Sequence, residues 1–240
     1  GIYFSVLIDG LNKLGHENAA LYAVQDDFSF DSAENIKKYE LKFKSKNIPF
    51  PIAGMSDEMP YDSTVYSKMS EHDYEVWINN FKEKLLHIKK DFDPDIIIAH
   101  HVFILSSLVC EVFADKKIIT LSHSTDVRQL MKNPWILEKY MPHIKEADEC
   151  ICVSLNDADS IVNKIGIAKD RLKVYGGGFR QDIFYQSDTK KEDDIIRLLY
   201  VGKISPSKGI YELVRAFPRL NEKYEGLEFH IVGNCDKEQG

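Results

Sequence analysis

Short apolar runs alternate along this sequence with segments whose apolar residues recur at helical spacing. Residues 96–99 form one such run after a turn at Pro94, which predicts a strand. A second strand is expected at Lys117–Leu121. Strands that are apolar along their whole length are typical of a parallel sheet covered on both faces. Residues 71–90 carry apolar side chains three and four positions apart, which predicts an amphipathic helix. The alternation predicts an α/β fold with a doubly wound, Rossmann-like parallel sheet.

Further elements of the same kind are expected on both sides of this region. Residues 48–64 contain three prolines and few periodic apolar residues, which predicts a loop. One helix is expected to end at Gly15, and another to begin at Ser154, where an acidic residue three positions later resembles a capping box. The remaining elements are a helix at 102–113 and strands at 19–24, 39–44, 149–153 and 171–175.

A domain boundary is expected after the three consecutive glycines at 176–178, because a polar run follows at 186–194. We therefore predict a first domain at residues 1–180, a linker at 181–194 and a second domain at 195–240. Two strands and one helix cannot bury a doubly wound core, so the second domain is expected to be incomplete in this sequence. Its expected elements are a buried strand, a helix and a second strand, at 196–201, 206–224 and 227–232.

The net charge of −7 argues against a nucleic-acid partner, because neutralising phosphates requires a clustered basic surface. No run of about 18 apolar residues is present to span a bilayer, and the first residues lack the pattern of a signal peptide. These features predict a cytoplasmic protein, with peripheral association at the inner face of a membrane left open. The four cysteines lack metal-type spacing, and we expect them to be buried and reduced: Cys110, Cys150, Cys152 and Cys235.

The turn at residues 202–209 is a candidate anion site. It follows an expected strand, and Ser205 before Pro206 fits the N-cap and the first position of a helix. Free amides and the positive end of the helix dipole attract anions at such an end. Lys203 and Lys208 flank the turn, so the segment indicates a diphosphate site. The alternative is a solvent-exposed turn, since the segment is neither a Walker loop nor a dinucleotide fingerprint.

Several segments resemble the family 4 glycosyltransferases of the GT-B fold, in an order and spacing that match nearly end to end. Those that resemble the start of the family's nucleotide-sugar-binding domain are 199–203, 208–209, 213–217 and 229–233. Those that resemble the family's first domain and linker are 15–17, 147–154 and 174–180, with Phe184. Arg180 stands where the family usually has aspartate.

The resemblance implies an enzyme that moves a sugar from a UDP- or GDP-sugar to a saccharide, lipid-linked or small-molecule acceptor in glycan biosynthesis of the bacterial type. It also implies retention of the anomeric configuration and no metal ion or other cofactor. Lys203 and Lys208 would contact the donor diphosphate, with Gly202 and Gly209 in the same turn. The family's paired glutamates, which hold the donor, would lie beyond Gly240, so these residues alone are expected to be inactive.

The first domain is expected to bind the acceptor. The resemblance implies that His123 is a catalytic residue, and it follows an expected strand at the edge where ligands of open α/β sheets bind. Gly1 would belong to the family's glycine-rich loop. Gly178 and His100 are also expected at the cleft, since His100 follows the strand at 96–99.

Two other functions stay open. One is a different GT-B enzyme, such as a nucleotide-sugar epimerase, and the other is a non-catalytic, two-lobed solute-binding module. A hydrolase triad of Ser122, His123 and Asp126 is rejected, because the three are close in sequence and no Gly-x-Ser-x-Gly elbow is present. Asp93 and Asp95 are interpreted as turn residues rather than metal ligands.

Overall fold

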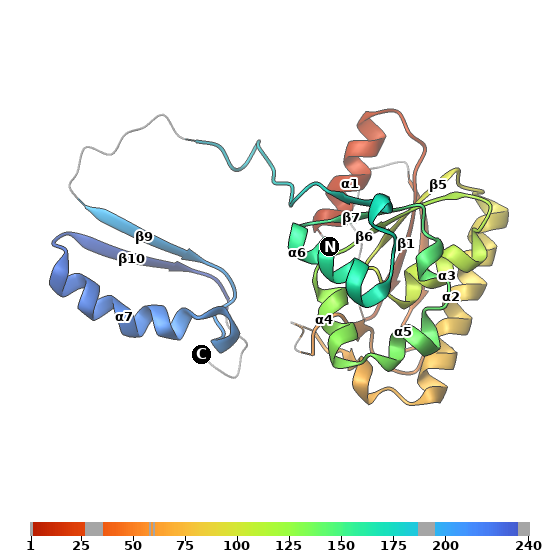
Figure 1. Cartoon of the computed structure of the whole chain (residues 1–240), viewed down its shortest axis with the longest axis horizontal. Coiled ribbons are helices and arrows are strands. Elements are labelled where there is room, and N and C mark those ends of the chain that lie inside the picture. Colours follow the sequence, from red (N-terminus) through yellow and green to blue (C-terminus); the bar gives the residue numbers. More distant parts are fainter. Residues whose placement is uncertain (1, 27–35, 58, 60, 187–194, 235–240) are drawn as a thin grey trace. The chain divides into compact units, whose positions relative to one another are not determined.

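A computed structural model of the chain describes residues 2–26, 36–57, 59, 61–186 and 195–234 (Figure 1). The chain divides into two compact units, Gly1–Gly178 and Phe179–Gly240. Each unit is described by itself below, as unit 1 and unit 2. Among the helices of the described residues, none combines the length and the hydrophobicity that a membrane-spanning helix needs.

The main sheet of unit 1 has four parallel strands in chain order, which confirms the predicted parallel α/β class. The strands are β5 (Ile96–His100), β6 (Lys117–Leu121), β7 (Glu149–Cys152) and β8 (Leu172–Val174). The helices between them are α3 (Ile104–Val112), α4 (Thr125–Lys132), α5 (Trp135–Tyr140) and α6 (Leu155–Ser160). Ser154 caps α6 as expected, since its hydroxyl accepts from the amide of Asp157 at 3.1 Å.

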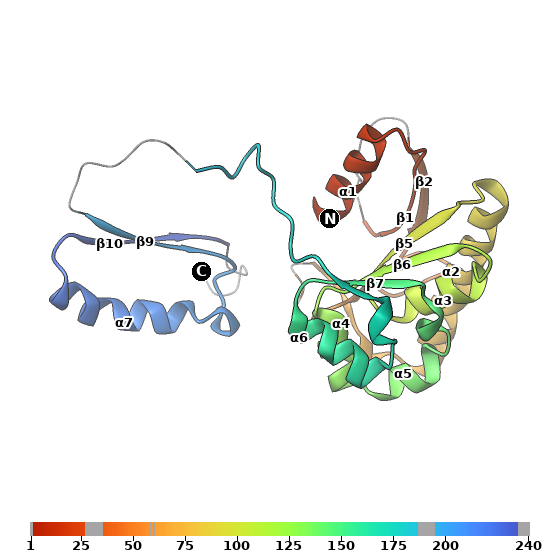
Figure 2. The same cartoon turned by 45° about the horizontal axis from the view of Figure 1, so that its top comes forward.

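The amino-terminal part of unit 1 forms a separate parallel pair, so the strands are not one continuous sheet. The pair consists of β1 (Ala19–Val24) and β2 (Lys37–Lys42), preceded by α1 (Ile2–Lys13). Figure 2 shows α1 above the strands and α3, α4 and α5 below them. Gly15 ends the first helix with a φ of 85°, as its position predicts. The expected loop at 48–64 contains one short parallel pair, β3 (Ala53–Gly54) and β4 (Thr64–Val65).

The long amphipathic helix α2 (Glu71–Asp91) forms as predicted. A capping box begins it: the Ser70 hydroxyl accepts from the Asp73 amide, and the Asp73 carboxylate accepts from the Ser70 amide. Its apolar face belongs to the core of unit 1, through Tyr74, Trp77, Phe81, Leu85 and Ile88. Tyr74 also stacks on Tyr140 of α5, with ring centroids 4.3 Å apart.

Three of the four cysteines are buried and free, as expected. Cys150 and Cys152 point to the same face of β7, with sulfurs 4.0 Å apart. Cys235 lies outside the described residues.

Unit 2 is a parallel pair of strands with one helix. It consists of β9 (Ile196–Val201), β10 (Leu227–Val232) and α7 (Ile210–Lys223), and Phe217 of the helix stacks on Phe229 of the sheet at 5.5 Å. The prediction of a buried first strand is wrong, because Leu199 and Val201 are 65% and 69% exposed. One helix covers too little of a two-stranded sheet to bury both of its faces.

Two further expectations need correction. The helix expected at 206–224 begins as a 3₁₀ turn at Pro206–Lys208, and the α-helix starts only at Ile210. Gly209 separates the two because its φ of 71° is left-handed and interrupts the helical backbone. The strand at residues 96–99 is not buried throughout either, since Ile96 is 58% exposed.

We predict that Gly233→Ala destabilises unit 2 by about 3 kcal/mol or more. A Cβ on Gly233 would lie 1.8 Å from the carbonyl oxygen of Gly202, so the ends of β9 and β10 would have to separate. Denaturant unfolding and hydrogen exchange of the β9 and β10 amides measure the effect. The control is Asn234→Ala, at an exposed neighbour, with a loss under about 0.5 kcal/mol; equal losses in the two variants would contradict the prediction.

Candidate functional site

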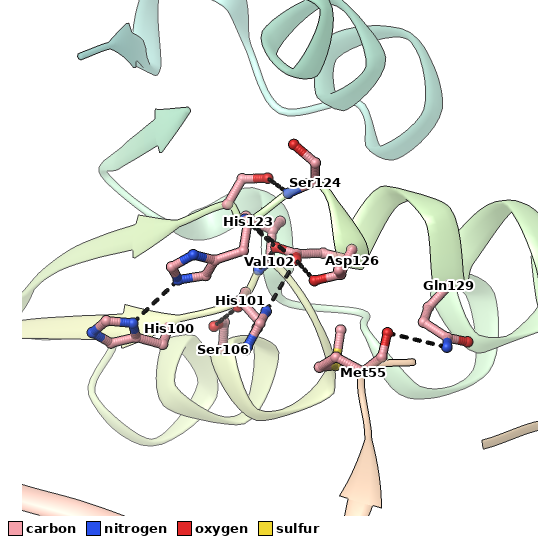
Figure 3. A network of polar contacts seen from close by, with 11 residues as sticks. Met55, His100, His101, Val102, Ser106, His123, Ser124, Asp126 and Gln129 are labelled. Atoms are coloured by element: carbon pink, nitrogen blue, oxygen red, sulfur yellow. Dashed lines mark hydrogen bonds and ion pairs between the residues drawn. The ribbon is translucent and has the colours of Figure 1, made fainter. Parts of the chain in front are cut away.

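Three histidines gather at the carboxyl ends of β5 and β6 (Figure 3). His100 is the last residue of β5, and His101 follows it with a left-handed φ of 70°. His123 comes two residues after the end of β6. Because β5 and β6 are parallel neighbours, their ends meet at one edge of the sheet, and the rings of His101 and His123 lie 4.8 Å apart. The structure thus brings the predicted His100 and His123 together, with His101 beside them.

Asp126, at the start of α4, holds these strand ends in place (Figure 3). Its side chain is fully buried. One carboxylate oxygen accepts from Nδ1 of His101 at 3.0 Å, and the other accepts from the amide of Val102 at 2.8 Å. The amide of His123 also donates to this carboxylate, at 3.3 Å. One buried carboxylate therefore joins the end of β5, the end of β6 and the first turn of α4.

These contacts determine the charge of Asp126. Burial alone would raise the pKa of its carboxyl, but hydrogen bonds from His101 and Val102, together with the positive charge that His101 carries when it is protonated, outweigh burial and lower that pKa. Asp126 is therefore an ionised acceptor at neutral pH. With His101 as donor through Nδ1, the ring of His101 is held in one orientation and its Nε2 remains to act on a ligand.

His100 and His123 form a second pair at this edge. Nδ1 of His100 lies 3.2 Å from Nε2 of His123, and the two rings are nearly parallel. Tyr3 and Phe4 of α1 pack edge-on against the ring of His100, at 5.7 and 5.1 Å. Burial and the neighbouring His123 and His101 lower the pKa of His100 to about 4, and burial and His101 also lower the pKa of His123. Both rings are neutral at neutral pH.

The geometry is not that of a hydrolase triad. Asp126 bonds the ring of His101 rather than that of His123, whose ring faces His100. Ser122 accepts a long 3.4 Å hydrogen bond from the amide of Ser124. No cluster of three or more metal-ligating side chains occurs within the described residues.

The sequence indicated His100 and His123, but it did not indicate the bond between His101 and Asp126. The local signal was present, since His101 is adjacent to His100 and Asp126 is in the first turn of a helix after a strand. The sequence does not reveal that the backbone is left-handed at His101 and at Ser124, where φ is 61°. These two turns set the positions of the strand end and of the helix that carries the carboxylate.

In unit 2, the four residues of the expected diphosphate site lie between the end of β9 and the start of α7. The amide of Gly202 donates to the carbonyl of Val232 at 3.0 Å, and the Tyr200 hydroxyl donates to the carbonyl of Lys203 at 2.7 Å. Gly209 is the N-cap residue of α7, and Lys208 directly before it is exposed. The carboxyl edge of this sheet thus carries one lysine on each side of the turn. Contact of Lys203 and Lys208 with a diphosphate stays a prediction.

The remaining expected site residues are two glycines. Gly1 lies outside the described residues. Gly178 is exposed at the end of unit 1, and an added Cβ there would meet no atom within 4 Å. In unit 2, the guanidinium of Arg180 pairs with Asp182. A ligand role for either glycine stays a prediction.

Comparison with known proteins decides the family. The model of Glycosyltransferase Family 4 matches residues 2–182. The chain belongs to this family. This assignment confirms the resemblance drawn from the sequence motifs.

The similar curated proteins are distant in sequence. An uncharacterized glycosyltransferase of Methanocaldococcus jannaschii is 22% identical over 222 residues, which cover 83% of this chain and 54% of that protein. The glycogen synthase of Mycobacterium tuberculosis is 22% identical over 159 residues, or 62% of this chain and 38% of that enzyme. The chain thus spans about half, or less, of the length of these curated relatives.

Among solved structures, the chain is similar to S. aureus MnaA with UDP and to a putative UDP-N-acetylglucosamine 2-epimerase of Listeria monocytogenes. The first has a TM-score of 0.44 and 11% identity, and the match covers 92% of this chain and 63% of that one. The second has a TM-score of 0.41 and 13% identity, and the match covers 84% and 56%.

We predict that Asp126→Asn lowers the free energy of unfolding by about 1–3 kcal/mol. Asparagine offers one oxygen and one NH₂ group, so either His101 or Val102 would face a donor instead of an acceptor. The control is Asp157→Asn, because Asp157 is also buried but its Oδ2 has no hydrogen-bond partner within the described residues. Denaturant unfolding should show little loss for this control. Similar losses in both variants would refute the role given to Asp126.

A second prediction concerns pH. The pKa of His100 is about 4 in the folded chain and 6.5 ordinarily, so the unfolded chain binds the extra proton between these values. The contribution of neutral His100 to the free energy of unfolding is fully present above pH 6.5 and is lost as the pH falls toward 4. We expect a loss on the order of 2 kcal/mol. Unfolding measured from pH 7 to 4.5 should show a flatter pH dependence for His100→Gln, and an unchanged slope would contradict the prediction.

Proposed function

We propose that the natural full-length polypeptide is a glycosyltransferase that takes a sugar from a UDP- or GDP-sugar and transfers it to an acceptor hydroxyl. The observation that carries this proposal is the family 4 match across residues 2–182. In this proposal unit 2 holds the diphosphate of the donor and unit 1 presents the acceptor. The acceptor is a saccharide, a lipid-linked molecule or a small molecule.

The donor part of the proposal rests on the turn between β9 and α7. Breaking the bond between sugar and phosphate builds negative charge on the departing nucleoside diphosphate. The ammonium groups of Lys203 and Lys208 and the amides at the start of α7 would stabilise that charge without a metal ion. Lysine supplies a point charge rather than the paired donors of arginine, so it would bind the phosphates without fixing their orientation in a bidentate way.

The acceptor part rests on the carboxyl edge of β5 and β6. His101 is held through Nδ1 by an ionised carboxylate, so its Nε2 would accept a hydrogen bond from the attacking hydroxyl. His123 is held neutral by burial and by His101, and its ring is at the same edge. A neutral imidazole can assist proton removal where an imidazolium cannot. Retention at the anomeric carbon is part of the proposal, and the linkage of the product determined by NMR tests it.

We predict that Lys208→Ala weakens binding of UDP or GDP by about tenfold to a hundredfold, because one hydrogen bond to a charged group contributes about 1.5–3 kcal/mol. Isothermal titration of the natural full-length polypeptide with UDP, GDP and ADP measures it. The matched control is Lys223→Ala, which removes the same charge from the last turn of α7.

The two lysine variants separate the outcomes. Binding that falls for Lys208→Ala and stays constant for Lys223→Ala supports a diphosphate site at the turn. Equal losses of nucleotide affinity in both variants would mean that the lysines act only through the net charge of the protein, and would contradict a specific site at the turn. Absence of binding by the unaltered polypeptide for all three nucleotides would reject the donor site itself.

A further inference from the structure

A mostly apolar cavity of about 450 Å³ lies in unit 1 beside the carboxyl edge of β5 and β6. His101 and Thr125 of that edge belong to its lining, and much of the remaining lining is aromatic: Phe43, Tyr66, Trp77, Phe81 and Phe103. Ligand sites in proteins have volumes of this order. An apolar cavity of about 150 Å³ already holds benzene, so this one has room for a ring system or a short alkyl chain.

The aromatic part of the lining is buried and preformed. Trp77 and Phe81 of α2 have ring centroids 4.1 Å apart, and Phe43 lies 6.2 Å from Phe81. Tyr66 packs edge-on against Phe103 at 4.8 Å. Burial raises the pKa of the Tyr66 phenol well above its ordinary value. These rings therefore offer a fixed, apolar surface to a ligand.

The outer part of the lining is adaptable. Met55, Met59 and Tyr61 lie in the segment between β3 and β4 and line the cavity, and all three are partly or largely exposed. Met59 packs across Gly54, where an added Cβ would come within 2.5 Å of its Cγ. Methionine side chains are flexible and polarizable, so they adjust to apolar ligands of different shape.

The cavity and the histidines are held by the same helix, α4. Gln129 of α4 is buried and donates to the carbonyl of Met55 at 3.2 Å and to the carboxylate of Asp57 at 3.1 Å (Figure 3). Asp126, in the first turn of α4, accepts from the ring of His101. The outer part of the lining is thereby fixed relative to the imidazole of His101.

The chemistry of the lining is that of an apolar ligand with one polar end. Among the described residues of the lining, the polar side chains other than tyrosine are His100, His101, Ser56 and Thr125, and three of these four lie at the carboxyl edge. The side chain of His101 is one-third exposed. A saccharide inside this cavity would leave several hydroxyls without hydrogen-bond partners, which is costly.

We propose that this cavity binds an apolar group of the acceptor, a ring system or a short alkyl chain, and that the hydroxyl that receives the sugar lies at Nε2 of His101. The inference rests on the function proposed above and narrows its acceptor to a molecule with an apolar group beside the reacting hydroxyl. Shape and apolar contact in the cavity would then select the acceptor, and His101 would orient its hydroxyl.

Methyl NMR of the natural full-length polypeptide, labelled at its methionines, tests the cavity without requiring turnover. The probes are naphthylmethanol and octanol, with glucose as the polar counterpart. We expect an alcohol to shift the methyl signals of Met55 and Met59 and to leave that of Met131, exposed on α4, unchanged. The alcohol that binds more tightly distinguishes a ring system from an alkyl chain. Absence of shifts at Met55 and Met59 with both alcohols, or equal shifts with glucose, would overturn the proposal.

A matched pair of variants tests the same site by affinity. Met59→Asp should weaken alcohol binding by about tenfold or more, because it places a charge in the apolar lining. Met131→Asp makes the same replacement at an exposed position and should leave the affinity unchanged. Equal affinities in the two variants would contradict the proposal. Failure of the proposed function would appear separately, as loss of nucleotide binding and of sugar transfer, since the alcohol titrations report only on the cavity.

Discussion

The carboxyl edge of unit 1 depends on the buried carboxylate of Asp126. It accepts hydrogen bonds from the backbone after β5, from the ring of His101 and from the backbone after β6. A buried charge is tolerated only where such donors surround it, and the removal of one of them leaves the charge uncompensated. The same contacts that keep Asp126 ionised thus fix the positions of His101 and His123. The stability of this edge and the geometry of the site therefore both depend on the hydrogen bonds that Asp126 accepts.

The carboxyl edge also borders an apolar cavity lined by residues of β1 and β5. His100 ends β5, faces His123 and lines this cavity, so its environment links the sheet to the candidate acceptor site. Its low pKa arises from burial and from its two histidine neighbours. A neutral His100 in turn limits the positive charge beside His101 and His123.

The sequence predicted best what depends on local pattern. The spacing of Tyr74, Trp77 and Phe81 predicted α2, and the apolar runs predicted β6, β9 and β10 at their observed bounds. The rule that ligands bind at the carboxyl ends of parallel strands placed His100 and His123 at one edge before their contact was known. Family membership likewise followed from short motifs in a fixed order.

The features that the sequence did not predict depend on contacts far apart in the chain. The helices α4 and α5 have only 8 and 6 residues, too few to form from propensity alone, and Gln129 of α4 bonds the carbonyl of Met55. Ile96 lines the apolar cavity beside β5 and is exposed, although the apolar pattern of residues 96–99 predicts a buried strand. The start of α7 at Ile210 depends on the left-handed backbone of Gly209, which glycine permits but does not require.

The decisive measurement is sugar transfer by the natural full-length polypeptide. Mass spectrometry of reactions with UDP- and GDP-sugars and a panel of saccharide and lipid-linked acceptors follows both products. We expect one acceptor to gain the mass of one sugar residue while an equal amount of UDP or GDP is released. A nucleotide-sugar that is isomerised without any change in acceptor mass, or one that stays intact with every acceptor, would contradict it.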